Sequence, residues 1–151
     1  MYHALVRARV RALWRRIEAG DFQAATAIAA PDIEFHFVGS NPLGPHLRGA
    51  VAFETWFEEA FAFLPGLQMS LVDVVVAGPP SRTTIAARLR IAATLADGTE
   101  YRNQAAQWAR LRWGRLTFDE ILFDTAALQA ACAVQIAAGQ RPPSTRLRVV
   151  T

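Results

Sequence analysis

The spacing of apolar residues changes halfway along the chain, and this change limits the folds that the chain can adopt. In the first half, apolar residues recur at steps of three and four, which is typical of amphipathic helices. In the second half they alternate with polar residues, which is typical of strands with one buried face. Helices followed by strands joined through short turns predict an α+β fold in which a curved antiparallel sheet covers a helical layer.

Turn and capping residues mark the ends of the predicted elements. Asp97-Gly98 is a typical type I′ hairpin signal, Gly20 and Gly139 are typical helix ends, and residues 39–45 form a dense turn segment. Helices are predicted over residues 4–19, 21–30, 50–64 and 125–138, and strands over residues 33–38, 71–77, 82–95, 101–113 and 115–123.

The composition indicates one folded domain. A chain of 151 residues with 52% hydrophobic residues can bury a core without the support of disulfide bonds or a structural metal. A single cysteine, Cys132, excludes a disulfide framework. We expect the domain to span residues 1–139, with residues 140–151 as a flexible C-terminal tail.

Charge and motifs exclude several classes of function. All 16 basic residues are arginines, but the net charge is only +3, so a nucleic-acid partner is not expected. No apolar run approaches the roughly 18 residues of a membrane helix, and the arginine-rich N-terminus lacks the apolar core of a signal peptide, so we expect a cytoplasmic protein without a membrane partner. The three histidines are scattered along the chain, and no carboxylate or thiol follows them at the spacing of a metal site, so no metal is expected. No phosphate-binding motif occurs, and no cofactor is expected either.

Short motifs occur in a fixed order along the chain. They are Glu18 to Phe22 ("EAGDF"), Ala30 to Phe35, Arg48-Gly49, Leu111 to Leu116 ("LRWGRL") and Phe123 to Thr125. Together with the order of elements, they resemble the nuclear transport factor 2-like superfamily, in its SnoaL-like polyketide cyclase and ketosteroid isomerase branch. The resemblance covers roughly residues 4–138. It implies a cone-shaped α+β fold with a pocket between the sheet and the N-terminal helices, and it implies a homodimer, which the apolar alternation of the long strands also favours.

His36 is the first candidate catalytic residue. Alternation along residues 33–38 places Glu34 and His36 on one face and two phenylalanines on the other. The resemblance aligns His36 with the aspartate base of the isomerases, which implies a neutral imidazole that lines the cavity and takes a proton near pH 7. The alternative is a packed histidine without chemistry.

Tyr101, Asn103 and Gln107 share one face of a predicted strand. The resemblance places Gln107 near the position where the isomerases hold a protonated aspartate, and a carboxamide can also donate to a substrate oxygen. Asn103 is expected to be a second donor and Tyr101 to contact the ligand. The alternative is that both amides bond only to backbone groups or to each other.

Asp124 is the third candidate catalytic residue. The resemblance aligns it with the acid/base aspartate of SnoaL-like cyclases, and from the pocket it would orient His36. The alternative is an ordinary N-cap, because Asp-Thr commonly precedes a helix.

The resemblance also has departures. The tyrosine that donates to the oxyanion in the isomerases corresponds to Leu13 here, so a steroid isomerase with the usual mechanism is not expected. Trp14, Trp56 and Phe57 are expected to line the ligand pocket, although such aromatic residues are more often simply core.

Two functions stay open from the residues. One is an enzyme that binds a small apolar carbonyl compound and transfers a proton without a cofactor, in an isomerisation, an aldol-type cyclisation or a dehydration. The other is a non-catalytic ligand-binding or dimerisation domain of the same fold, with its pocket filled by aromatic side chains.

Overall fold

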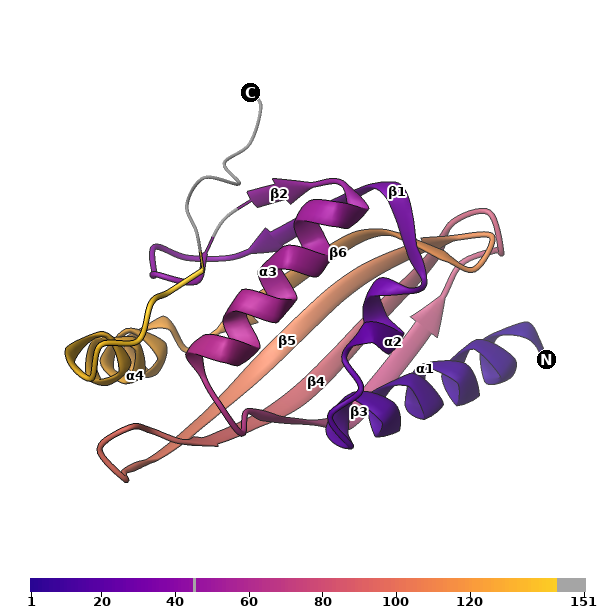
Figure 1. The fold of residues 1–151 in the computed structure, drawn as a ribbon. Coiled ribbons are helices and arrows are strands. Elements are labelled where there is room, and N and C mark those ends of the chain that lie inside the picture. Colours follow the sequence, from indigo (N-terminus) through magenta and orange to yellow (C-terminus); the bar gives the residue numbers. More distant parts are fainter. Residues whose placement is uncertain (45, 144–151) are drawn as a thin grey trace.

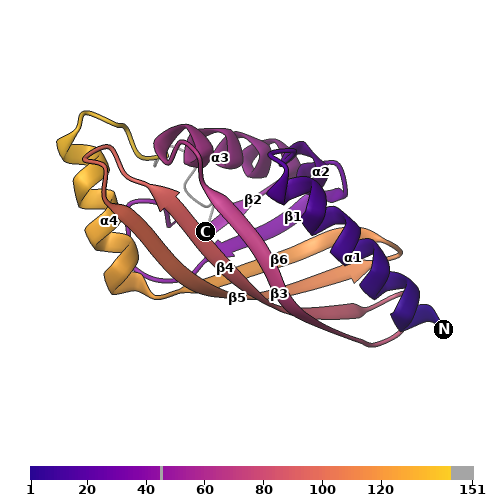
Figure 2. The same cartoon turned by 90° about the horizontal axis from the view of Figure 1, so that it is seen from below.

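Helices cover the concave face of a curved, six-stranded sheet in the computed structural model, which describes residues 1–44 and 46–143 (Figure 1). Figure 2 shows α1 and α3 on this face, with α4 across one end of the sheet. This arrangement confirms the predicted α+β cone. The elements are α1 (Tyr2–Glu18), α2 (Gln23–Thr26), β1 (Ala29–Phe37), β2 (His46–Arg48), α3 (Ala50–Phe63), β3 (Gln68–Ala77), β4 (Thr83–Thr94), β5 (Glu100–Arg112), β6 (Arg115–Phe123) and α4 (Thr125–Ala137).

The order of strands in the sheet is β2-β1-β6-β5-β4-β3. Neighbouring strands are antiparallel except β1 and β6, which run parallel, with Phe35 opposite Asp119. The predicted antiparallel meander is therefore correct for β3 to β6. The parallel pair brings the first strand next to the last one.

The helix α1 packs along β3 through the side chains that the sequence spacing predicted. Its buried residues are Val6, Val10, Trp14 and Ile17. The start of α1 is held by two side-chain bonds: the Tyr2 hydroxyl lies 2.5 Å from Thr83 Oγ1, and His3 Nε2 lies 2.7 Å from the carbonyl oxygen of Gly78.

An aromatic cluster joins β1 to α3. Phe35 is fully buried, and its ring centroid lies 4.6 Å from that of Trp56 and 5.1 Å from that of Phe53. Burial of one such ring contributes roughly 1.5–3 kcal/mol to stability. This packing determines which face of β1 points inward.

Two predicted local structures differ from the observed ones. The second helix is limited to α2, because Ala29 pairs with Leu116 of β6 and draws the following residues into β1. The type I′ turn predicted at Asp97-Gly98 is a longer loop over residues 95–99. A two-residue turn occurs instead at Trp113-Gly114, where φ is 52° and 81°.

The predicted C-terminal tail, residues 140–151, falls mostly on residues 144–151, which lie outside the described part of the chain. Among the described residues, no helix combines the length and the apolar character needed to cross a membrane.

Candidate active site

The sheet and the helices enclose an apolar cavity of about 100 Å³. Its volume is comparable with the roughly 150 Å³ of an engineered protein cavity that binds benzene. Four residues that the sequence predicted as ligand contacts line it, namely Trp14, Trp56, Phe57 and Tyr101. Apart from the two indole groups, the lining carries polar side chains only at Tyr101, Gln107 and Asp119. A ligand of this cavity must therefore be largely apolar.

Gln107 and Asp119 form a hydrogen-bonded pair in the cavity wall. They come from the adjacent strands β5 and β6, and Gln107 Nε2 donates to Asp119 Oδ1 over 2.8 Å. Asp119 lies opposite Ala109, whose small side chain leaves room above the sheet for the carboxyl group. Within the described part of the chain, Gln107 is the only side chain that bonds to this carboxyl group.

The protonation of Asp119 follows from its surroundings. The residue is 3% exposed. Burial raises the pKa of its carboxyl group to about 7, and the hydrogen bond from Gln107 opposes the rise. A carboxyl group with this pKa is present in both protonation states near neutral pH, so it can take up and return a proton.

The sequence reasoning missed Asp119, although a signal was present. Asp119, Ile121 and Phe123 are at alternate positions and share the inward face of β6. A carboxylate between apolar inward positions is rare unless it is paired or functional, so the alternation alone could have singled it out.

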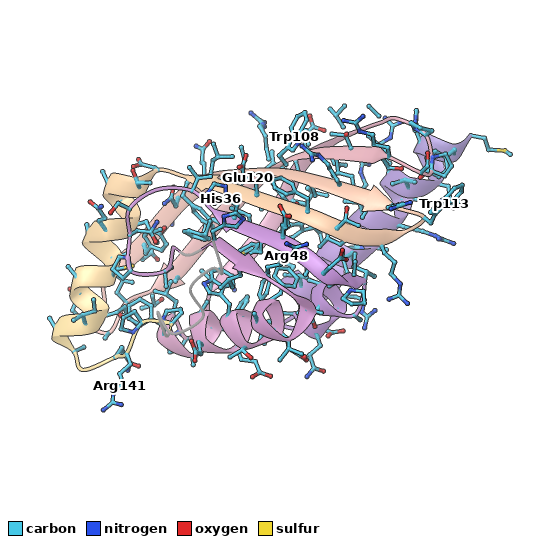
Figure 3. All side chains as sticks on the ribbon, turned by 90° about the horizontal axis from the view of Figure 1, so that it is seen from above. His36, Arg48, Trp108, Trp113, Glu120 and Arg141 are labelled. Atoms are coloured by element: carbon cyan, nitrogen blue, oxygen red, sulfur yellow. The ribbon has the colours of Figure 1, made fainter. Side chains whose placement is uncertain are left out.

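The prediction that His36 lines the cavity is wrong. Phe35 and Phe37 pack inward against α3, so His36 lies on the outer face of the sheet, with 41% of its side chain exposed. Its Nδ1 lies 3.0 Å from Glu120 Oε2, and its ring centroid lies 4.9 Å from that of His46. Figure 3 shows His36 beside Glu120. Among residues 1–44 and 46–143, no three His, Cys, Asp or Glu side chains form a group that could hold a metal ion.

The prediction that Asp124 reaches the cavity is also wrong. Asp124 is the N-cap of α4, and its Oδ1 accepts from the backbone N–H groups of Ala126 and Ala127 at 3.1 and 3.2 Å. The alternative that the sequence offered, an ordinary helix cap, is confirmed. The expected bond between Asp124 and His36 does not form: Asp124 Oδ1 accepts from the first turn of α4, and His36 Nδ1 bonds to Glu120 on the outer face of the sheet.

Asn103 is buried and does not line this cavity. Its Nδ2 donates to the carbonyl oxygen of Asp124 over 3.0 Å and to the Tyr101 hydroxyl over 2.7 Å. Its Oδ1 accepts from the backbone N–H groups of Gln104 and Asp124. The amide therefore joins β5 to the start of α4. The alternative that both amides bond only to backbone groups or to each other is wrong, because Asn103 also bonds to Tyr101 and Gln107 bonds to Asp119.

The family described as the SnoaL-like domain matches residues 10–118. Bal32a, from a soil-derived mobile gene cassette, is 18% identical with a TM-score of 0.67, and the match covers 81% of this chain and 92% of Bal32a. TerC, co-crystallised with polyporic acid, is 18% identical with a TM-score of 0.66, and the match covers 85% of this chain and 97% of TerC. IdmH from Streptomyces antibioticus, for which a polyketide cyclase activity is proposed, is 20% identical with a TM-score of 0.63, and the match covers 81% of this chain and 94% of IdmH. At these identities the likeness is one of fold. No curated protein matches the sequence.

Proposed function

This chain belongs to the family of SnoaL-like domains, and from that premise we propose that it is a small-molecule enzyme. Its substrate is an apolar carbonyl compound, and its reaction is a cofactor-free proton transfer at the carbon next to the carbonyl group. The observation that carries the proposal is Asp119, a buried carboxyl group with a pKa of about 7 in an otherwise apolar cavity.

Asp119 acts as the general base in this proposal. Its carboxylate takes a proton from the carbon beside the carbonyl group, and the electron pair of that C–H bond moves to give an enolate. If the substrate is a β,γ-unsaturated ketone, the enolate is conjugated with the C=C bond, and return of the same proton to the γ carbon shifts that double bond and completes an isomerisation. Attack of the enolate carbon on a second carbonyl group of the substrate completes an aldol-type cyclisation, and Asp119 returns its proton to the new alkoxide.

Gln107 has two tasks in this reaction. One N–H of its amide holds Asp119 Oδ1, which orients the carboxylate. The second N–H is available to the enolate oxygen, and such a donor is more effective in a cavity without water than in solution. Trp14, Trp56 and Phe57 hold the apolar body of the substrate, and the Trp56 ring is fixed because its Nε1 donates to the carbonyl oxygen of Leu43 over 2.8 Å.

Asp119→Asn tests the proposal, because it removes the base but keeps the shape of the side chain. Substrates are first found by recording deuterium exchange next to the carbonyl group in a set of apolar ketones. We expect the variant to lose this exchange by a factor of about 10² to 10⁴, while it still binds the same ketones. Unchanged exchange removes Asp119 as the base. Ketones that bind to wild type without any exchange favour the alternative, a non-catalytic ligand-binding domain.

We also propose that two copies associate through the outer face of the sheet. Three large apolar side chains are exposed there on β3, β5 and β6, namely Val75 at 61%, Trp108 at 44% and Leu122 at 41%. The register places Ala86 between Val75 and Trp108, and Ala106 next to Leu122, so the three apolar side chains lie close together on this face. Two charged residues lie among them, Glu120 opposite Trp108 and Arg88 opposite Ala106. Such surfaces on a soluble domain commonly mark a protein interface.

A further inference from the structure

Tyr101 lines the same cavity as Gln107 and Asp119. It precedes Gln107 by six positions on β5, so the two side chains come from different parts of the strand. Its side chain is 5% exposed and lines the cavity. The cavity therefore has two separate polar points, Asp119 with Gln107 at one and the Tyr101 hydroxyl at the other.

The orientation of the Asn103 amide decides what the Tyr101 hydroxyl can do. Asn103 Oδ1 receives two backbone N–H donors, from Gln104 and Asp124, so this atom must be the oxygen. Asn103 Nδ2 faces the carbonyl oxygen of Asp124, which only accepts, so this atom must be the nitrogen. The backbone thus rules out a flipped amide, and the 2.7 Å bond to Tyr101 is one in which Asn103 donates.

The bond to Asn103 consequently does not use the hydroxyl proton of Tyr101, which needs an acceptor elsewhere. The Tyr101 oxygen already accepts from Asn103, and no described residue accepts from it in return. Burial raises the pKa of Tyr101, so the hydroxyl keeps its proton at neutral pH. A buried donor without a partner is unfavourable. Because Tyr101 lines the cavity, an acceptor atom of a bound ligand can take this bond.

We propose that the Tyr101 hydroxyl is a second oxygen-binding point, which donates a hydrogen bond to a second acceptor oxygen of the ligand. This inference rests on the proposed function and narrows its substrate class. The substrate is a small apolar compound with two acceptor oxygens, one bound at Gln107 and Asp119 and one at Tyr101. Between these points the compound meets apolar lining residues such as Ile91, Phe123 and Leu128.

A matched pair of probes tests the second point. The first probe is cyclohexanone, and the second is 4-acetylcyclohexanone, in which an acetyl group is attached to the ring carbon opposite the ketone. We expect wild type to bind the acetyl analogue about three- to tenfold more tightly, as one added hydrogen bond allows. Tyr101→Phe removes only the hydroxyl oxygen, and we expect it to bind both probes with the same Kd. Titration calorimetry measures all four values.

Tyr2→Phe is the matched control, because Tyr2 is the other tyrosine of the chain and its hydroxyl bonds to Thr83 outside the cavity lining. This variant should keep the wild-type preference. The inference is overturned if wild type binds neither probe or binds both equally, as it would with a water molecule on the hydroxyl, or if Tyr101→Phe keeps the preference. Deuterium exchange of the ketone reports on Asp119 separately: a preference that depends on Tyr101, without any exchange, refutes the proposed catalysis but not the second binding point.

Discussion

Burial of the Asp119 carboxyl group makes the stability of the protein depend on pH. Its pKa is about 7 in the folded chain and about 3.9 in an unfolded one. Between these values the native state holds more protons than the unfolded state. The free energy of unfolding of the wild type therefore falls as the pH rises from about 4 to about 7.

We predict that Asp119→Asn stabilises the protein, because it replaces a carboxyl group that is costly to ionise. The gain should be small at pH 4, grow up to about pH 7, and level off above it at no more than about 4 kcal/mol. Urea denaturation at several pH values measures it. A difference between variant and wild type that does not change with pH would contradict the raised pKa.

Gln107 should shift the pH dependence of the reaction through its bond to Asp119. That bond lowers the pKa of the carboxyl group, so Gln107→Leu should raise it further. Because the base acts in its ionised form, the rise of kcat/KM with pH should move to higher pH. Gln104→Leu, on the exposed outer face of the same strand, is the control and should leave the profile unchanged. If the pH profile of Gln107→Leu does not shift, Gln107 does not affect the pKa of the catalytic base.

The turn between β5 and β6 contains a tryptophan in a conformation that favours glycine or asparagine. Trp113 has a φ of 52° and is 71% exposed. Its backbone N–H donates to the carbonyl oxygen of Pro80 over 2.8 Å. This bond joins the β5–β6 turn to the loop between β3 and β4. The backbone of Trp113 is thus held in the left-handed region, which is unfavourable for most residues by roughly 1–2 kcal/mol.

Trp113→Asn is predicted to stabilise the chain by about 1 kcal/mol, since asparagine tolerates this conformation better. The Tm should rise by about 2–4 °C, measured by calorimetry. Trp113→Ala keeps the backbone penalty and should give no such rise. Equal gains in the two variants would mean that the exposed indole, and not the backbone, is the source.

Local periodicity predicts most helices and strands here, and on β1 it also indicates the buried face, because apolar residues such as Phe35 alternate with polar ones such as His36. This apolar face packs against the rings of α3. Only the resemblance placed His36 in the cavity. The residues of β5 that lie beside Asp119 depend on the pairing of β6 with β5, whose register shifts between Arg110 and Leu111. The aromatic lining was predictable from composition and spacing, whereas the approach of Asp119 to Gln107 depends on that long-range register.

The exposed apolar side chains on the outer face of the sheet predict that the protein forms a dimer in solution. If two copies pack through Val75, Trp108 and Leu122, Trp108→Arg places a charge inside the interface. We expect the wild type to elute as a dimer in gel filtration and the variant as a monomer with unchanged circular dichroism. Trp113→Arg, also an exposed tryptophan but at the β5–β6 turn, should stay dimeric. A wild type that elutes as a monomer at micromolar concentration would refute the interface.

The parallel pairing of β1 with β6 has a consequence for synthesis of the chain. When β1 leaves the ribosome, its partner strand, residues 115–123, has not yet been translated. One edge of β1, which carries Phe35 and Phe37, therefore stays unpaired until residues 115–123 emerge. During this interval β1 is an unpaired strand with apolar side chains, and such a segment is prone to aggregate.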